Sequence, residues 1–502
     1  MIVDFHKIQE IVGHPSYRMV VHCHGVFDIL HIGHLRMLKK AAELGDTLVV
    51  SITADDHVGK GPGRPVYGER FRAEMLDGLE CVDFVVVVPF PSGKEIIEKI
   101  RADIYAKGAQ YEGTETPALL EEKETCRKQG TKFEYVYDPV ISSSTELVKH
   151  VGDWPKEVVE AMDGIKKEHG FDGVVAWLDK ARKQSVAVMG EAIIDEYVQC
   201  EVLGRSSKSH LAALRRVQEK RYAGGSVAVA KVLEGFCDDV FLLALTGVDE
   251  GRDWLRSQVG EMDHIFVGRC DGPTVLKRRY WERYYGLPMC EVYEMTDHYL
   301  QPIDEQKLAR EAGIKAKTAD VTIVTDYGHG MFTPSIISEI GRSVNYLALN
   351  VQQNAGNQGL SKFQKWGCGA DCLTMALAEF WLSRGERIDS ERLIQQGICL
   401  MANDMKSGRV VVTRGRDGCL AYNRDDGGFL TFPSIAFEVK DRVGAGDVFL
   451  SFFSLFSACS APLDVSLFVS SAAAAFAVSR MGPGGGFITR ESLLRHIKGL
   501  LS

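Results

Sequence analysis

The chain has 502 residues, of which 45% are hydrophobic and 25% charged, and its formal net charge at pH 7 is −9. One hydrophobic core does not extend over so long a chain, so we expect two or three domains of ordinary soluble composition. The negative net charge argues against a nucleic-acid-binding surface as the main function, and we expect no nucleic acid among the partners.

Cysteine spacing and hydropathy argue against a zinc-binding, a secreted or a membrane protein. The 12 cysteines are scattered, and neither a second pair nor a histidine pair completes a zinc pattern with Cys368 and Cys372. We interpret them as reduced thiols of a cytoplasmic protein. The first residues lack the basic and apolar regions of a signal peptide. The most apolar stretch, residues 465–478, is too short to span a bilayer and predicts a buried helix, so no membrane association is expected.

The first 150 residues alternate strand and helix patterns, which predicts a parallel sheet with right-handed crossovers. Residues 84–88 are all apolar, as in a strand buried on both faces of a sheet. Strands are expected over 19–22, 48–52, 84–88, 103–106 and 134–137, and helices over 33–44, 69–79 and 96–100.

A second α/β pattern begins at Ser185, after a charged, helix-prone segment. We therefore divide the chain into a first domain over residues 1–150, a helical linker over 151–184 and a second domain over 185–502. In the second domain strands are expected over 186–189, 240–245, 321–325, 347–351 and 410–413, and helices after the Gly224-Gly225 pair up to Leu233, over 446–456 and over 464–478.

The first chemical motif spans residues 25–34 and joins the first expected strand to the first expected helix. In open α/β sheets ligands bind beyond the carboxyl ends of strands, and the amides at a helix N-terminus favour an anion. His31 and His34 are three residues apart, so both imidazoles can share one helix face. Their ring donors can hold a polyphosphate and stabilise charge as pyrophosphate leaves. The alternative of two histidines that only cap a helix is disfavoured by the complete Gly-x-Phe-Asp-x-Leu-His-x-Gly-His string.

Residues 18–148 resemble the cytidylyltransferase-like nucleotidyltransferases, and most closely the adenylyltransferase half of the ADP-heptose synthesis enzymes. The matching segments are residues 25–34, 60–66, 69–70, 72–74, 81–83 and 107–108. The resemblance implies a Rossmann-like domain whose catalytic and nucleotide- or phosphate-binding residues are Gly25, Phe27, Asp28, His31, His34, Lys107, Ser143, Ser144 and Thr145. Gln110 stands where the family usually carries an acidic residue, which puts sugar contacts there in question.

The second chemical motif spans residues 441–447 and precedes a strongly apolar helix pattern. The small residues at 444–446 let the backbone approach a ligand closely, and their amides at a helix start can stabilise a transferring phosphoryl group. Asp447 is placed to accept the proton of an attacking hydroxyl. Many ordinary helices also begin with glycine and aspartate, so the motif by itself is a weak signal.

Residues 185–500 resemble the PfkB or ribokinase-like carbohydrate kinases. The matches are Gly190 with Asp195, the pair Gly224-Gly225, and residues 326–330, 412–418 and 444–447. The resemblance implies a ribokinase-like α/β fold with Asp447 as the base. It further implies an anion hole of Gly444, Ala445 and Gly446, sugar contacts from Asp195, Gly224 and Gly225, ATP contacts near Thr413 and Gly415, and a metal contact from Glu379.

Three departures from the kinase pattern concern the sugar and the metal. Ala228 stands where the heptose kinases usually carry Asn, and Ala376 replaces the Asn of an Asn-x-x-Glu motif that ends at Glu379. The residues 350–352 replace the usual Asp-Pro-Lys. The phosphoryl-transfer core is thus retained, whereas sugar recognition and metal placement are altered.

The two motifs together predict a bifunctional enzyme of activated-sugar synthesis. ATP is the expected phosphoryl donor and nucleotidyl donor, a sugar phosphate the other substrate, and Mg²⁺ neutralises polyphosphate charge at both sites. The bifunctional ADP-heptose enzymes carry the kinase first, so the order is reversed here. Two alternatives stay open: a transferase that uses CTP to form a CDP-linked polyol or sugar, and a second domain that binds ligand without catalysis. A homodimer is a further option.

Overall fold

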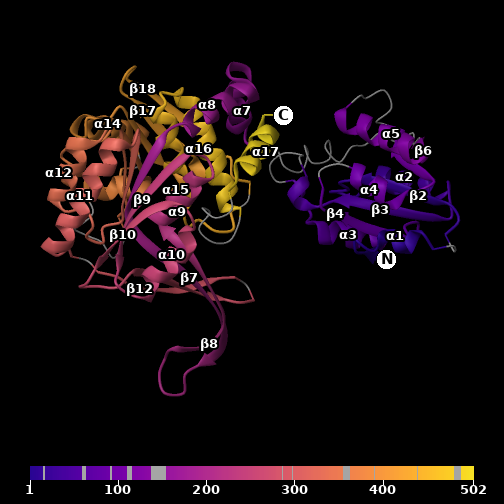
Figure 1. Cartoon of the computed structure of the whole chain (residues 1–502), viewed down its shortest axis with the longest axis horizontal. Helices are drawn as coiled ribbons and strands as arrows, with labels where there is room; N and C mark the ends of the chain where they lie inside the picture. Colours follow the sequence, from indigo (N-terminus) through magenta and orange to yellow (C-terminus); the bar gives the residue numbers. More distant parts are fainter. Residues whose placement is uncertain are drawn as a thin grey trace. The chain divides into compact units, whose positions relative to one another are not determined.

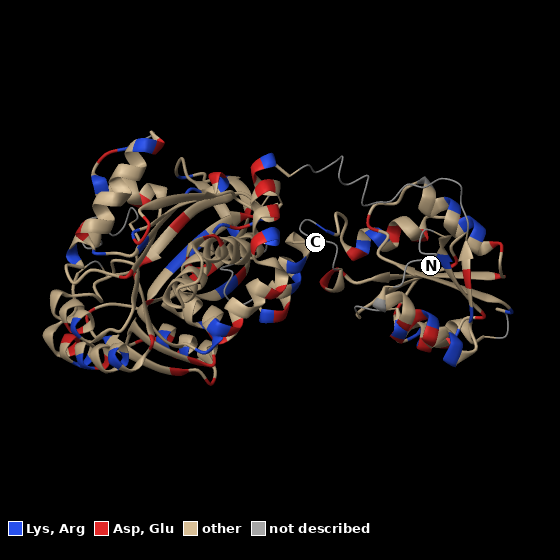
Figure 2. Cartoon of the chain, turned by 90° about the horizontal axis from the view of Figure 1, so that it is seen from above, with Lys and Arg blue, Asp and Glu red and all other residues tan. Residues whose placement is uncertain are grey.

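The computed structural model describes residues 1–14, 17–58, 64–90, 93–109, 116–136, 154–284, 286–296, 298–353, 362–388, 390–437, 439–479 and 488–501, without the side chains of Ile32 and Pro117. The chain divides into two compact units, Met1–Pro155 and Lys156–Ser502. Acidic and basic residues are interspersed along the helices of both units (Figure 2).

Unit 1 is built on a six-stranded parallel sheet in the order β1-β4-β3-β2-β5-β6 (Figure 1). The strands are Ile2–Val3 (β1), Val20–Gly25 (β2), Thr47–Thr53 (β3), Phe84–Val88 (β4), Ile104–Gly108 (β5) and Lys132–Val136 (β6), and the helices are Ile8–Val12 (α1), Ile32–Ala42 (α2), Glu69–Asp77 (α3), Lys94–Ile100 (α4) and Pro117–Gln129 (α5). The strand order reverses at β2, which pairs with β3 on one edge and β5 on the other. Ligands of open sheets bind at such a reversal, beyond the carboxyl ends of the strands.

Helix α5 of unit 1 was not expected from the sequence. Its start is fixed by Thr116, whose hydroxyl accepts a hydrogen bond from Leu119 N at 3.3 Å, and its end by Gly130, which has a φ of +75°. The helix has few buried positions and a highly charged sequence, so its apolar periodicity is weak.

Unit 2 is built on a larger sheet with the strand path β10-β9-β7-β13-β14-β15-β16-β17-β18. The strands are Ser185–Arg205 (β7), Ala212–Gly225 (β8), Asp239–Gly247 (β9), Asp263–Arg269 (β10), Val275–Glu282 (β11), Pro288–Glu294 (β12), Val321–Asp326 (β13), Leu347–Val351 (β14), Cys372–Ala376 (β15), Arg409–Thr413 (β16), Cys419–Asn423 (β17) and Gly428–Phe432 (β18). The path is parallel from β10 to β16 and antiparallel from β16 to β18.

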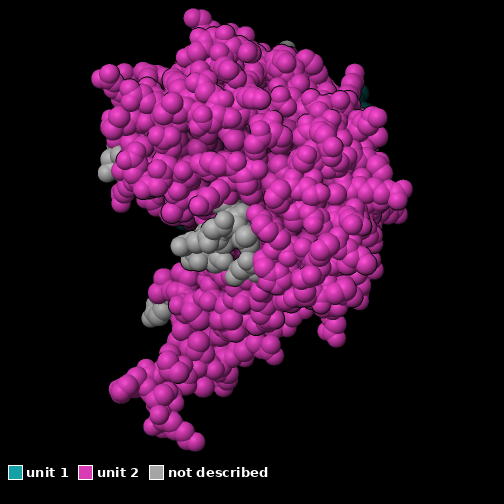
Figure 3. Space-filling model, turned by 90° about the vertical axis from the view of Figure 1, so that its left-hand side faces the viewer, with its two compact units in different colours: residues 1–155 teal, residues 156–502 magenta. Residues whose placement is uncertain are grey.

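Strand β7 is much longer than the expected strand over 186–189. Residues 185–191 pair with β9 in the main sheet, and residues from 192 onward pair with β8. The outer part of β7, together with β8, β11 and β12, forms what we call the outer sheet. Its β7–β8 hairpin projects from the body of unit 2 (Figures 1 and 3). The sequence prediction stopped before Gly190 because the charged residues Glu191, Asp195 and Glu196 interrupt the apolar run after it, although the structure buries all three.

Unit 2 also contains eleven described helices, most of which contact strands of the sheet. They are Lys156–Glu168 (α7), Gly170–Arg182 (α8), Ser226–Glu234 (α9), Glu250–Val259 (α10), Pro302–Thr318 (α11), Pro334–Ser343 (α12), Leu377–Arg384 (α13), Glu391–Asp404 (α14), Ala445–Ala458 (α15), Leu463–Val478 (α16) and Arg490–Leu500 (α17). The segment that we interpreted as a linker contains α7 and α8, which contact α16, α15 and α17. Among the described helices, none combines the length and the hydropathy needed to cross a membrane.

Candidate functional site

The loop after β2 is shaped by Gly25 and Phe27. Phe27 has a φ of +47° and turns its ring back onto Gly25, where a Cβ atom would lie only 3.1 Å from the ring. The ring is 5% exposed and meets the His34 ring at a centroid distance of 5.3 Å. Both residues that the resemblance assigned to nucleotide binding therefore set the path of the loop that delivers His31.

His31 and His34 lie together at the start of α2, as their spacing predicted. His31 is the N-cap residue, and its Nδ1 accepts a hydrogen bond from Gly33 N at 3.1 Å. An Nδ1 that accepts leaves the proton of a neutral imidazole on Nε2. The two ring centroids are 3.9 Å apart, so the rings can act on one ligand group beside the amides of the helix start.

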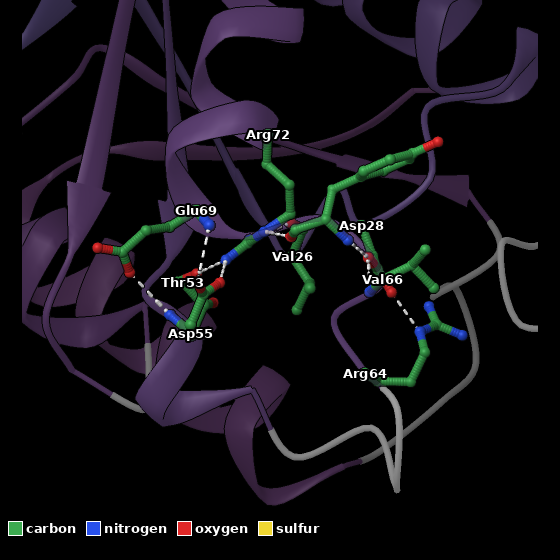
Figure 4. Close-up of polar contacts among 9 residues, drawn as sticks. Val26, Asp28, Thr53, Asp55, Arg64, Val66, Glu69 and Arg72 are labelled. Atoms are coloured by element: carbon green, nitrogen blue, oxygen red, sulfur yellow. Dashed lines mark hydrogen bonds and ion pairs between the residues drawn. The ribbon is translucent and has the colours of Figure 1, made fainter. Parts of the chain in front are cut away.

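Asp28 does not stand open to a ligand, because it is fully buried and anchors the segment 64–67. Its carboxylate pairs with Arg64 and accepts hydrogen bonds from Val66 N at 2.5 Å and Tyr67 N at 3.2 Å (Figure 4). Lys60 and its glycine-rich neighbours up to residue 63 lie outside the described residues, as do Gln110, Ser143, Ser144 and Thr145.

Arg72 is the buried centre of this end of unit 1. Its guanidinium donates to Val26 O at 2.6 Å, Thr53 O at 2.8 Å and Asp55 Oδ1 at 2.6 Å (Figure 4). It thereby fastens the loop after β2 to the end of β3. The sequence placed Arg72 in a matching segment but gave no reason to assign it this role.

Lys107 lies at the end of β5 in a buried polar cluster. Its ammonium donates to Glu122 Oε2 at 2.6 Å, and both side chains are nearly buried. On the neighbouring strand, Nδ1 of His24 lies 2.8 Å from Ser51 Oγ. Burial, reinforced by the charge of Lys107, lowers the pKa of His24 to about 3, so the imidazole is neutral near pH 7. Glu122 comes from α5, and no pattern in the sequence pointed to it.

In unit 2 the helix α15 begins with the predicted anion-hole residues. Gly444 is the N-cap with a φ of +80°, which favours glycine, and a Cβ at Gly446 would meet open space. Asp447 lies in the first turn, where its Oδ1 accepts a hydrogen bond from Tyr327 OH at 2.8 Å. Burial raises the pKa of Asp447 to about 6, and the bond from Tyr327 opposes that shift. A carboxylate with a pKa near 6 is suited to accept a proton at neutral pH.

Asp447 faces a cavity of about 360 Å³ that gathers residues from distant parts of unit 2. The lining residues are Ile193, Asp195, Gly225, Lys277, Arg279, Tyr327, Asn350, Gln352, Thr374, Met375, Ala376, Glu379, Thr413, Arg442, Val443, Gly444, Gly446, Asp447 and Phe449. The cavity thus includes the sequence-predicted residues Asp195, Gly225, Thr413 and Glu379. Gly224, Ala445 and Gly415 are not among the lining residues.

Gly224 instead supports Asp195 from behind. A Cβ at Gly224 would fall 2.0 Å from Asp195 Oδ2, so only glycine lets the carboxylate adopt this position. Gly415 has a φ of +62° and begins the short turn that follows β16. Ala228 is buried in α9 and does not line the cavity.

Two cations of the cavity were missed by the sequence analysis. Arg279 donates to Asp195 Oδ1 at 2.5 Å. Lys277 is only 7% exposed, and no ion pair with a described residue is found for its ammonium. Burial lowers the pKa of Lys277, and the nearby carboxylates of Asp195 and Asp447 oppose that shift. Both cations come from β11, whose pairing with β7 could not be foreseen from the sequence.

Tyr327 is positioned by a buried carboxylate that also lacked a sequence signal. Glu191 accepts hydrogen bonds from Tyr327 N at 2.9 Å and His329 N at 3.0 Å, and it is 1% exposed. Burial and the negative charge of Asp326 raise the pKa of Glu191. Asp326 in turn accepts from Trp366 Nε1 at 3.0 Å. Buried hydrogen bonds to Glu191 and Asp326 therefore fix the loop over 326–331.

Glu379 lies at the start of α13 and is hydrogen-bonded to its own helix. Its Oε2 accepts from Ala376 N at 2.7 Å. Burial raises the pKa of Glu379 to about 7. The carboxylate lines the cavity, but part of its acceptor capacity is used by this bond.

Two family models match separate parts of the chain. Residues 22–150 match the model described as cytidylyltransferase-like, and residues 340–490 match the pfkB family carbohydrate kinases. The chain joins a cytidylyltransferase-like domain to a pfkB family domain. The expected α/β fold class of both domains is thereby confirmed.

The relatives found by sequence match the N-terminal region. The bifunctional protein HldE of Syntrophotalea carbinolica is 36% identical over 138 residues, which cover 27% of this chain and 27% of that protein. HldE of Campylobacter curvus is 43% identical over 111 residues, which cover 22% of this chain and 24% of that protein. The chain therefore matches only about a quarter of the length of these relatives.

Solved structures resemble the second unit in fold. Phosphofructokinase-2 from Escherichia coli in complex with potassium gives a TM-score of 0.52 at 14% identity, covering 63% of this chain and 99% of that chain. The same enzyme with fructose-6-phosphate gives a TM-score of 0.51 at 13% identity, with the same coverage. At this identity the likeness shows the fold alone.

Proposed function

We propose that the chain is a bifunctional enzyme of nucleotide-activated sugar synthesis. Unit 2 transfers a phosphoryl group from ATP to a sugar or sugar phosphate. Unit 1 transfers a nucleotidyl group, AMP from ATP, to a sugar 1-phosphate and releases pyrophosphate. The observation that carries the proposal is the position of Asp447 beside the amides of the α15 start, inside a cavity that also contains Asp195.

The chemistry of unit 2 follows from the cavity lining. Asp195, held by Arg279, accepts a hydrogen bond from a sugar hydroxyl and orients the ring. Asp447 accepts the proton of the attacking hydroxyl, since an alcohol is a poor nucleophile until its proton is removed. The backbone amides at residues 444–446 stabilise the charge on the transferring phosphoryl group. Lys277 adds a cation for a negatively charged group of either substrate.

The chemistry of unit 1 needs no covalent nucleophile. The Nε2 donor of His31 and the ring of His34 hold the triphosphate at the helix start. They stabilise charge on the leaving pyrophosphate while the sugar phosphate attacks the α-phosphate. Lys107, which the resemblance assigned to phosphate, lies at the carboxyl end of the adjacent strand β5.

Mg²⁺ fits the donor chemistry of the unit 2 cavity, because Glu379 presents a carboxylate there and hard cations prefer oxygen ligands. Glu379 would hold the ion together with the ATP phosphates. When bound, the ion neutralises polyphosphate charge.

Two features of the expected metal site favour a second candidate, in which unit 2 binds a ligand without catalysis. Ala376 provides no side-chain donor or acceptor at the expected Asn position, and Glu379 is engaged by the Ala376 amide. Both features weaken the metal site on which phosphoryl transfer depends. An ATP-binding measurement separates this candidate from an active kinase that has been assayed only with sugars it does not accept.

The test is a turnover screen with the full chain. ADP release is measured with ATP and Mg²⁺ over a panel of sugars and sugar phosphates, and pyrophosphate release with ATP or CTP over sugar 1-phosphates. We expect Asp447→Asn to abolish only the first activity and the His31→Ala, His34→Ala double variant only the second. Absence of ADP release with every sugar, together with absence of ATP binding, would refute the kinase. Pyrophosphate release with CTP alone would replace ATP by CTP as the nucleotidyl donor.

A further inference from the structure

A second cavity, of about 270 Å³, lies on the outer sheet, and we call it the outer groove. Three strands each contribute an aromatic residue to its lining: Tyr197 from β7, Tyr222 from β8 and Trp281 from β11. Polar side chains that include Gln199, Gln218 and Lys220 complete the lining. The projecting β7–β8 hairpin in Figures 1 and 3 carries part of this surface.

The outer groove and the cavity of Asp447 lie along one face of the outer sheet. Asp195 and Tyr197 are two residues apart on β7, as are Arg279 and Trp281 on β11. Residues two apart on a strand point to the same side and are separated by about 6.6 Å. Arg279 pairs directly with Tyr197, so these side chains of β11 and β7 lie on the same face of the sheet. A ligand can therefore extend from Asp195 into the outer groove without leaving this face.

The aromatic rings of the outer groove form a continuous, partly exposed surface. The Tyr197 and Trp281 rings are nearly parallel, with an interplanar angle of 29° and centroids 6.1 Å apart, and Tyr222 meets Tyr197 edge to face at 5.5 Å. Tyr197 is fixed from both sides, since its hydroxyl donates to Asp441 at 2.8 Å and Arg279 lies over its ring at 5.7 Å. These contacts fix the orientation of the Tyr197 ring in the absence of a ligand.

One donor of the outer groove makes no hydrogen bond within the described part of the chain. The indole Nε1 of Trp281 is shielded from solvent and makes no hydrogen bond to any described residue. A buried N–H without an acceptor is unfavourable, so a ligand oxygen that accepts from it gains binding free energy. The nearby amides of Gln199 and Gln218 can each donate and accept.

We propose that the outer groove is a carbohydrate subsite that holds the second ring of an extended acceptor, a disaccharide or glycoside whose first ring lies at Asp195. The inference rests on the proposed kinase function of unit 2. A sugar ring has an apolar face of C–H groups that suits the aromatic surface, and hydroxyls that suit the indole N–H and the amides. The acceptor class is thereby larger than a single sugar ring.

The test uses binding, so that it does not depend on turnover. Isothermal titration calorimetry of the full chain, saturated with a non-hydrolysable ATP analogue, compares mannobiose, maltose, cellobiose and lactose with their monosaccharides. We expect at least one disaccharide to bind about tenfold or more tightly than its monosaccharides, a difference of about 1.4 kcal/mol. Trp281→Ala should abolish that preference and leave monosaccharide binding unchanged. Trp254→Ala, in α10 and outside both cavities, is the matched control and should keep the preference.

Several outcomes would overturn the proposal. Equal affinity for disaccharides and monosaccharides would do so even if monosaccharides are phosphorylated, which leaves the kinase function intact. Competition by adenosine instead of disaccharides would assign the groove to a nucleoside. Conversion of a dimer to a monomer by Trp281→Ala, with saccharide binding unaltered, would assign it to a second copy of the chain. If Trp281→Ala does not fold, Trp281→Phe and the exposed Gln218→Ala test the same preference.

Discussion

The two candidate sites are assembled in opposite ways. His31 and His34 belong to one uninterrupted segment, and a bond between neighbours, His31 Nδ1 with Gly33 N, fixes their geometry. Asp447 meets Asp195 and Lys277 only because α15, β7 and β11 converge on one cavity. A site formed within one turn of the chain can be predicted from the sequence. Of a site formed by segments far apart in the chain, only the glycine-rich motif can be predicted. Substitutions at the two sites test this difference.

The largest effect is expected for Asp447→Asn. The variant keeps the shape of the carboxylate but cannot accept a proton, so phosphoryl transfer should fall by about two to four decades. The rate of ADP release measures the effect, and ATP affinity should change little. Turnover close to that of the wild type would show that another group serves as the base.

Replacement of His31 or His34 by Ala should lower pyrophosphate release by about a hundredfold or more. Each imidazole acts on charge that develops in the transition state, and the loss of one such donor costs about 2–4 kcal/mol. Circular dichroism should show an intact fold, because the rest of α2 is unaltered. Near-normal release from the double variant would contradict the assignment.

Arg72 and Arg70 provide a matched pair for stability. Arg72→Met leaves the carbonyls of Val26 and Thr53 without a donor and the Asp55 carboxylate without its cation, so unit 1 should lose about 3 kcal/mol or more. Arg70→Met alters an exposed pair with Glu74 and should leave the unfolding midpoint nearly unchanged. Differential scanning calorimetry of the full chain measures both. Equal midpoints for the two variants would show that the buried contacts of Arg72 are dispensable.

Lys277→Met should separate binding from stability. An ammonium hydrogen-bonded to an anionic ligand group contributes about 1.5–3 kcal/mol, so kcat/KM for phosphoryl transfer should fall about tenfold or more. The melting temperature should not fall, because a buried cation that has no ion pair with any described residue is replaced by an apolar side chain of similar length. A lower melting temperature with unaltered kinetics would instead give Lys277 a structural role.

The smallest expected effect is a shift in a pH profile. Asp447 is active as a base only when ionised, so kcat/KM should decline as the pH falls through about 6. Tyr327→Phe removes a hydrogen bond that favours the ionised carboxylate, which raises the pKa of Asp447 further and moves this limb to higher pH. Initial rates between pH 5 and 8 test the sign, and a shift to lower pH would contradict it.

The sequence predicted elements well where the run of apolar residues was nearly continuous. The strand over 84–88 has the predicted bounds, and α15 and α16 extend the two predicted apolar helices by only a few residues. An apolar run of this kind predicts burial directly, because a strand or helix with few polar residues has to be covered on every side. The same logic failed for β7 after Gly190, where the strand stays buried as it crosses into the outer sheet but buried charged residues such as Glu191 and Asp195 interrupt the apolar run.

Functional side chains could be predicted when they belong to a sequence motif. They could not be predicted when only strand pairing or helix packing brings them to the site. Lys277 and Arg279 lie in a strand with no glycine or histidine signature, and only the register between β11 and β7 aims them toward Asp195. Glu122 lies in a helix whose charged sequence is typical of a solvated surface, yet it is nearly buried against Lys107. Such partners are set by tertiary contacts, which leave no local pattern.

Strand β7 has a mechanical consequence. Its hydrogen-bonded ladder runs without a loop from β9 and β13 in the main sheet to β8 and β11 in the outer sheet. An outer sheet joined in this way has no free pivot on β7, so any displacement of Asp195 relative to Asp447 has to twist or bend the strand itself. We therefore expect the bending stiffness of β7 to oppose any displacement of the outer sheet from the position that the structure shows.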